Sequence, residues 1–369
     1  MEDKQISMEE KHISPESYWN LVWRKFKLNK PGLIGSFLVM ILLSLAVFSD
    51  FFSPSDPNGL YMTLTFRPPQ RVRFIHEGQL SRPFVYPQVS EWSFETMTGT
   101  WRDDTSRKFY IRFFIQGYEY SIFGIRSNLH LFGTSEGEHF FALGSDKMGR
   151  DMWARMCIGS RISMTMALFG TLISIFIGAC FGTISGYFGG KIDVLMQRFT
   201  EFMQSFPQLP LWMALVAIVP RHWNQMTIFV IMALIFALLS WPVLSRELRG
   251  KVISMAGSDM ILAAKEMGAS HRRIIFKHLF PNNFSHIIVV MTLTIPSICL
   301  AESFLSFLGI GIQDPMVSWG LLMRDAQTIE TLGGRPWIMF PVLMIVATVL
   351  GFNFLGDGLR DGADPYTRH

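Results

Sequence analysis

The chain alternates between long apolar runs and polar segments, and the apolar runs are long enough to cross a bilayer as helices. A spanning helix needs about 20 predominantly apolar residues. Runs of about this length occupy residues 32–50, 162–186, 195–219, 226–245, 284–312 and 337–356. The pattern predicts an all-α polytopic membrane protein with about six transmembrane helices, although five or seven would also fit the less regular runs.

The first apolar run follows a polar, charged lead of about 30 residues. A cleaved secretory signal lies within the first 15–30 residues, so we expect the run at 32–50 to be retained as a spanning helix. Ser14 and Pro15 predict a helix start within the lead. The aromatic and cationic residues that follow, such as Trp23 and Arg24, predict a flanking anchor for the span or a helix in the membrane interface.

Residues 51–145 form the largest region without an apolar run of spanning length. A turn-rich start at 53–59 leads to short alternating runs, such as 72–76 and 108–116, which predict β-strands. We therefore expect an inserted, mostly β lobe between the first and second spans. It would either cover the outer ends of the helices or receive a partner that delivers substrate.

The placement of charge orients the chain more than its net charge of +4 does. Basic residues gather before the first span and in the polar segment 246–283, and cytoplasmic loops are enriched in Lys and Arg. We expect both termini and this segment to be cytoplasmic, with residues 51–145 outside. Because the basic segment is held at a membrane surface, we do not expect it to bind nucleic acid.

The sequence carries no signature of catalysis. Its three cysteines imply no disulfide framework, and it has no CxxC, HExxH or Gly-rich phosphate loop. A membrane-anchored enzyme would need a nucleophile and a base in 51–145, where His76, His130 and His139 lack metal-ligand spacing. A secondary transporter would show internal repeats and ionisable relays, and only Glu201 and Glu302 qualify. We expect no catalytic residue, metal or cofactor.

The run at 162–186 has small residues at almost every fourth position, which predicts close packing against another helix. These residues are Gly170, Ser174, Gly178, Gly182 and Gly186. The run at 195–219 instead carries a polar stripe, and a carboxylate is unfavourable in lipid. The stripe, like a polar group in 284–312, predicts either a lining of a transport pathway or a polar clamp between helices. The residues concerned are Gln197, Glu201, Gln204, Gln208, Glu302, Ser303 and Ser306.

The segment just before the second span reads GSDKMGRD at 144–151. Gly144 and Gly149 permit tight turns, and Asp146 and Asp151 are suited to cap the following helix. Arg150 is expected to pair with one of these carboxylates or with a neighbouring subunit. The segment is thus a capping turn, with partner contact as the alternative.

The polar segment 246–283 keeps helical periodicity over about 40 residues, which is more than a loop between two spans needs. We expect it to dock onto another protein. Gly268 and Ser270 divide it into two short helices, with Ser270 capping the second. Arg272 and Arg273 are expected to bind the rim of the partner's groove. Its apolar anchors are expected to be Met255, Ile261, Leu262, Ile274, Ile275 and Leu279.

In the same segment, Ala263 and Ala264 are followed by Gly268 and Pro281, a spacing similar to the signature of bacterial ABC-importer permeases. Further blocks resemble the dipeptide/oligopeptide permeases, in the C-type subunit of the heterodimer. They are RKFKLNKPGLIG (24–35), LGSDKMGRDMWARMCIGSRIS (143–163), SGYFGGKIDVLMQR (185–198), GASHRRIIFKHLFPN (268–282), AESFLSFLGIGIQDP (301–315) and FLGDGLRDGADP (354–365). Two features depart from the family: Leu262 replaces its usual Glu, for which Glu266 is a substitute one turn later, and the region before residue 143 is longer.

The resemblance implies a type I ABC importer permease fold in the bacterial inner membrane. Its parts would be a cytoplasmic or interfacial segment (1–31), a first transmembrane helix (32–50), a periplasmic lobe (51–145), a permease core (146–356) and a cytoplasmic tail (357–369). It also implies three kinds of protein partner, besides the membrane lipids: a homologous second permease subunit, two cytoplasmic ATPases that bind ATP and Mg, and a substrate-binding protein.

Residues 255–281 would couple the chain to the ATPases, which carry out hydrolysis. The coupling residues implied are Ala263, Ala264, Glu266, Gly268, Arg272, Arg273 and Pro281. Peptides are the implied cargo, with nickel or another small solute as the alternative.

Overall fold

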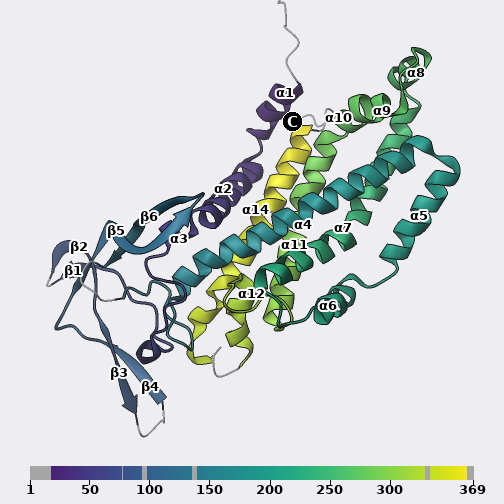
Figure 1. Ribbon diagram of the computed structural model, residues 1–369. Coiled ribbons are helices and arrows are strands. Elements are labelled where there is room, and N and C mark those ends of the chain that lie inside the picture. Colours follow the sequence, from purple (N-terminus) through teal and green to yellow (C-terminus); the bar gives the residue numbers. More distant parts are fainter. Residues whose placement is uncertain (1–17, 77, 94–97, 135–138, 329–332, 364–369) are drawn as a thin grey trace, which may run out of the picture.

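The computed structural model is a bundle of long helices with a β region at one end (Figure 1). It describes residues 18–76, 78–93, 98–134, 139–328 and 333–363. The helix start expected at Ser14 and Pro15 lies outside these residues. The first described helix, α1 (Tyr18–Phe26), lies at the end of the bundle opposite the β region, beside the end of the last helix (Figure 1).

Within the described residues, five helices are long and apolar enough to cross a membrane. They correspond to five of the predicted runs, and they are α2 (Lys30–Val47), α4 (Met152–Phe188), α7 (Gln225–Ala256), α11 (Phe284–Phe307) and α14 (Phe340–Ala363). α4 begins before its apolar run and α7 ends well after its own. Both helices therefore extend into the polar segments that the sequence pattern placed in loops.

The prediction of a single spanning helix at 195–219 is wrong. The chain forms α5 (Gly190–Gln204) and the shorter α6 (Gln208–Ile218), separated at Ser205–Pro207. Pro207 has an extended ψ of 122° and no N–H to continue the first helix, and a proline also disfavours helical geometry in the residue before it. An 11-residue helix rises only about 16 Å, which is half of the hydrocarbon thickness.

The small-residue face of α4 lies directly on α7. A Cβ added at Gly182 would come within 2.5 Å of the Ser245 carbonyl oxygen. At Gly178 and Gly186 it would meet α7 carbonyl oxygens at 2.7 and 2.8 Å, and Ser174 is buried. The two backbones approach so closely that only hydrogen fits at Gly178, Gly182 and Gly186.

The β region contains the strands predicted near 72–76 and 108–116. Its strands are β1 (Arg73–His76), β2 (Gln79–Val85), β3 (Gln88–Ser93), β4 (Thr98–Asp103), β5 (Phe109–Ile122) and β6 (Ile125–Thr134). Four of them form an antiparallel sheet in the order β1-β2-β5-β6, and β3 and β4 form a separate hairpin. Phe84 of β2 is fully buried opposite Tyr110 of β5.

Short helices complete the fold. Before α4 these are α3 (Ser49–Phe52), which follows α2 directly, and η1 (Met62–Leu64). Between α7 and α11 lie α8 (Asp259–Glu266), α9 (His271–Arg273), the π-helical η2 (Ile274–Leu279) and α10 (Phe280–Asn282). Between α11 and α14 lie α12 (Trp319–Leu322), η3 (Met323–Gln327) and η4 (Pro336–Met339).

Candidate functional site

The segment between α7 and α11 (255–281), which we call the coupling segment after its expected role, projects at the end of the bundle opposite the β region (Figure 1). Gly268 joins α8 to α9 with φ +77°, a backbone conformation that favours glycine. No heavy atom lies within 4 Å of a Cβ added there. The Arg273 N–H donates to Ser270 Oγ at 3.4 Å, so that Ser270 caps the helix it precedes. The conformation of Gly268 therefore sets the angle between two short helices.

The expected apolar anchors of this segment are mostly turned inward, which corrects the sequence interpretation. Ile261, Ile274 and Leu279 are at most 1% exposed and pack with Leu248 and Val252 of α7. Helices this short are unstable in water alone, and burial of their apolar faces against α4 and α7 stabilises them. Leu262, one of the predicted anchors, is exposed as predicted, and the other large apolar side chains left exposed are Met260, Met267 and Phe276.

The predicted coupling residues form an exposed group around this folded unit. Ala264 is buried, whereas the other six are exposed: Ala263, Glu266, Gly268, Arg272, Arg273 and Pro281. Tyr187 at the end of α4 hydrogen-bonds His271 Nδ1 at 2.7 Å, and the Lys265 ammonium lies 5.4 Å from the centre of the Tyr187 ring. The segment is thus fastened to α4 as well as to its own flanking helices.

An ion pair that the sequence analysis missed joins α5 to α7 near the coupling segment. Arg249 Nε and Nη2 donate to the two carboxylate oxygens of Asp193, each at 2.6 Å. Ser185 of α4 donates to the same carboxylate. Such a bidentate pair fixes orientation as well as distance. The signal in the sequence was an acid within the 185–198 block, but nothing there identified its partner 56 residues later.

The predicted polar stripe divides between two environments. Gln197 donates to Ser185 Oγ at 3.0 Å, while Glu201 is exposed and pairs with Arg198 at 3.0 Å. Gln204 is exposed. Gln208 lines a cavity of about 910 Å³ between α6, α7 and α11.

The charged groups of that cavity were not singled out from sequence. Glu247, Lys251, His286 and Arg360 line it, and His286 Nε2 lies 3.1 Å from Glu247 Oε2. They come from three helices, which explains why no local motif connects them. The cavity therefore combines an apolar wall with groups of both charges.

Glu302, Ser303 and Ser306 lie inside the bundle. The Glu302 carboxylate is fully buried and accepts hydrogen bonds from Ser163 Oγ at 3.0 Å and Ser306 Oγ at 2.7 Å. Since Ser163 is on α4, the contact links α4 to α11. This geometry favours the clamp between helices over the pathway lining for these three residues.

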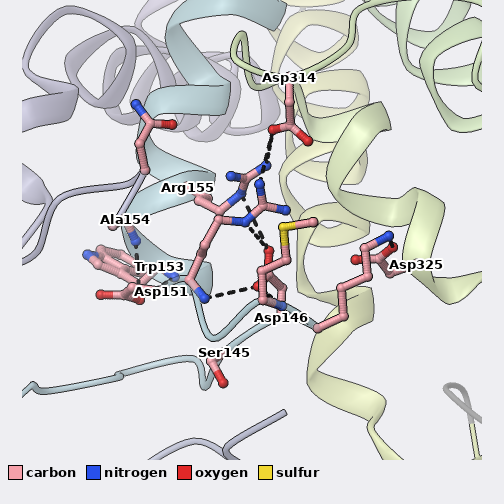
Figure 2. A network of polar contacts seen from close by, with 12 residues as sticks. Ser145, Asp146, Asp151, Trp153, Ala154, Arg155, Asp314 and Asp325 are labelled. Atoms are coloured by element: carbon pink, nitrogen blue, oxygen red, sulfur yellow. Dashed lines mark hydrogen bonds and ion pairs between the residues drawn. The ribbon is translucent and has the colours of Figure 1, made fainter. Parts of the chain in front are cut away.

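The turn at 144–151 is tied to the loop after α11 by the ionic network in Figure 2. Arg150 Nε donates to Asp146 at 2.6 Å, and its Nη1 reaches Asp314 at 3.2 Å. Arg155 Nη2 donates to the same Asp314 oxygen at 2.9 Å. Although partial burial alone would raise it, the two guanidinium groups lower the pKa of Asp314. The network joins distant parts of the chain, and sequence reasoning missed Arg155 and Asp314.

Asp151 caps α4 by accepting hydrogen bonds from the N–H groups of Trp153 and Ala154, and Ser55 Oγ donates to its other oxygen. Asp146 instead closes the preceding turn. Burial raises the pKa of Asp151 to about 7, although the hydrogen bonds oppose this. Between its unfolded pKa of about 4 and pH 7, the folded state therefore holds more protons than the unfolded state.

We predict that this carboxyl destabilises the protein as the pH rises from 5 to 7, by roughly 2 kcal/mol. The contribution is favourable below the unfolded pKa and is lost above pH 7. Asn keeps the cap but does not titrate. The midpoint temperature of thermal unfolding in detergent should therefore fall less between pH 5 and pH 7 for Asp151→Asn than for the unaltered protein. Parallel pH profiles for the two proteins would contradict the prediction.

Comparison with known proteins gives two family matches. Residues 178–369 match the family described as binding-protein-dependent transport system inner membrane component. Residues 17–69 match the N-terminal TM domain of oligopeptide transport permease C. Most of the β region lies between the two matches.

Similar proteins include the oligopeptide transport system permease protein OppC of Haemophilus influenzae, 43% identical over 64% of this chain and 73% of that protein. The dipeptide transport system permease protein DppC of Bacillus subtilis is 40% identical over 63% of this chain and 70% of that protein. OppC of the same organism is 36% identical, over 63% and 73%.

Proposed function

Because the chain belongs to the family of binding-protein-dependent transport system inner membrane components, we propose that it is the C-type permease subunit of an ATP-driven peptide importer. The observation that carries the proposal is the combined match of both ends of the chain, one to the permease family and one to oligopeptide permease C. Relatives named as oligopeptide and dipeptide permeases support peptides as cargo and do not favour nickel.

We propose a type I importer fold in which α5 and α6 together form the interrupted third of six membrane segments. α1, the end of α14 and the coupling segment lie at one end of the bundle and the β region at the other (Figure 1). This arrangement supports cytoplasmic termini and a periplasmic β lobe at 51–145, since the basic lead before α2 and the basic segment 246–283 both lie at the first end.

The coupling segment is proposed to dock onto a cytoplasmic ATPase. Its exposed side chains Leu262, Met267 and Phe276 offer apolar contacts, and Arg272 and Arg273 offer charge-assisted hydrogen bonds. Since its buried face packs on α4 and α7, displacement of the segment moves these helices as a rigid body. Hydrolysis of ATP belongs to the ATPase, and this chain contributes the mechanical link.

Half of the translocation pathway is proposed to run along the cavity between α6, α7 and α11, completed by a homologous permease subunit. Gln208 and the charged groups at the cavity wall provide polar contacts for a peptide. Glu201 and Gln204, on the exposed face of α5, extend this polar surface.

At the other end, a substrate-binding protein is proposed to deliver the cargo. A cleft of about 780 Å³ lies there between the β3–β4 hairpin and the start of α14. Trp101, Trp337 and Phe340 line it together with Arg71 and Arg102, which gives it both apolar and cationic contact surface.

We expect proteoliposomes that contain the chain, its permease partner and both ATPases to accumulate a labelled tripeptide only with ATP and the binding protein. Omission of each component in turn is the control. Uptake driven by an ion gradient without ATP would contradict the proposal and indicate a secondary transporter. Accumulation of nickel in place of peptide would overturn the cargo assignment alone.

A further inference from the structure

The β5–β6 hairpin ends in an exposed apolar tip. Ile122 pairs with Ile125 across a two-residue turn, in which Phe123 and Gly124 have φ of +50° and +83°. Asn-Gly and Asp-Gly are preferred in such turns, and a bulky residue with positive φ is uncommon. Phe123 is nevertheless 88% exposed and Ile125 is 73% exposed. A strained aromatic residue that the described residues leave this exposed suggests a contact outside the chain.

The middle of this hairpin is fixed beside the end of a membrane span. His130 of β6 is fully buried, and its Nδ1 lies 2.8 Å from the Asp50 carbonyl oxygen. Tyr118 of β5 donates to the Asp50 carboxylate at 3.4 Å. Asp50 belongs to α3, which begins two residues after α2 ends, and Arg161 of α4 holds its carboxylate at 2.7 Å. The hairpin therefore has a fixed height relative to α2 and α4.

The order of its contacts gives the direction of the hairpin. Near the end of β6, a Cβ added at Gly133 would lie 3.7 Å from the Cβ of Pro54. Three residues nearer the turn, His130 contacts Asp50. Residues of β6 that are nearer the turn thus contact residues that are nearer α2. Ile125 lies five positions beyond His130, or about 16 Å along an extended strand. The tip consequently reaches back to the level of the last turns of α2.

We propose that this tip, Ile122–Ile125, inserts into the outer leaflet of the lipid bilayer and anchors the β lobe to the membrane surface. Phe123 and Ile125 bury in the acyl boundary, where aromatic and branched apolar side chains are favoured. Arg126, the next residue, is exposed and suited to bind lipid phosphate groups. Exposed Glu119, about 10 Å behind the turn, limits the depth of insertion.

The inference depends on the proposed function only through the membrane placement of α2 and α4. The tip lies in the part of the chain between the two family matches, at residues 17–69 and 178–369. Its lipid contact is independent of cargo and of ATP.

The test uses the full chain in nanodiscs of phosphatidylethanolamine and phosphatidylglycerol. An environment-sensitive fluorophore is attached at Phe123→Cys in a Cys180→Ser background, since Cys157 and Cys299 are buried. The control is Leu80→Cys, which is 90% exposed but belongs to β2, away from the hairpin tip. We expect nitroxide-labelled lipid to quench the Phe123 site at least twofold more than the Leu80 site, and an aqueous quencher to act in the opposite order.

Equal quenching at the two sites would overturn the proposal, because the tip would then lie in water. Protection of the Phe123 site from both quenchers would also overturn it and indicate a protein partner. Neither measurement requires transport, so a chain that fails in peptide uptake can still show insertion, and an active transporter can still lack it.

Discussion

Gly182→Leu is expected to prevent stable assembly of the helix bundle, and Gly182→Ala to lower its stability markedly. A Cβ at this position would lie 2.5 Å from the Ser245 carbonyl oxygen and 3.0 Å from the Leu248 Cβ, so the α7 backbone itself would have to move. Overpacking of a well-packed core costs about 1–3 kcal/mol, and the clash with backbone puts Ala at the upper end of this range. Thermal unfolding in detergent and the yield of monodisperse protein measure the effect.

The matched control is Gly250→Ala on α7, where no heavy atom lies within 4 Å of the added Cβ. Ala also favours a helix over Gly by about 1 kcal/mol, so this variant should be as stable as the unaltered protein or more stable. If Gly182→Ala unfolds at the same temperature as Gly250→Ala, the two helices are not in the close contact that the structure describes.

Apolar patterning identified most of the membrane segments because a long apolar run has few other uses. Its error at 195–219 came from counting apolar residues across Pro207, whose missing N–H and whose ring, which clashes with the carbonyl group four residues earlier, end the preceding helix. The prediction also made α4 and α7 too short, because it left out the first turns of α4 and the last turns of α7. These turns are polar, and their helical form depends on tertiary contacts such as that of Arg249 with Asp193.

The candidate site was less accessible from sequence for a related reason. Residue type indicated that the apolar side chains of Ile261 and Ile274 would be buried in a contact, but not whether that contact is with the same chain or with a partner. That choice depends on α4 and α7, which cover them in the fold. The pairing of Arg155 with Asp314 spans 159 positions and likewise needs the tertiary structure. Local signals, such as the Asp151 cap, required no such information.

The coupling segment gives the second large expected effect. We predict that Gly268→Pro abolishes ATP-dependent uptake while the protein still folds and inserts. Gly268 has φ +77°, and proline fixes φ near −65°, so α8 and α9 must meet at a different angle. Coupling energies between two sites are typically 1–3 kcal/mol, which corresponds to about a 5–150-fold effect. With α8 and α9 at the wrong angle, most of the coupling between ATP hydrolysis and uptake should be lost. Peptide uptake and substrate-stimulated ATP hydrolysis are measured in proteoliposomes with the partner subunits.

Two further variants separate coupling from folding. Gly268→Asn is the conservative control, because Asn tolerates a positive φ and the position has open space around it, so it should retain most uptake. Met267→Glu changes an 81% exposed apolar side chain without disturbing the buried face. It should weaken binding of the ATPases and leave thermal stability within about 0.5 kcal/mol. Normal uptake by both Gly268→Pro and Met267→Glu would show that the ATPases act on the bundle elsewhere, and the lever function of this segment would have to be abandoned.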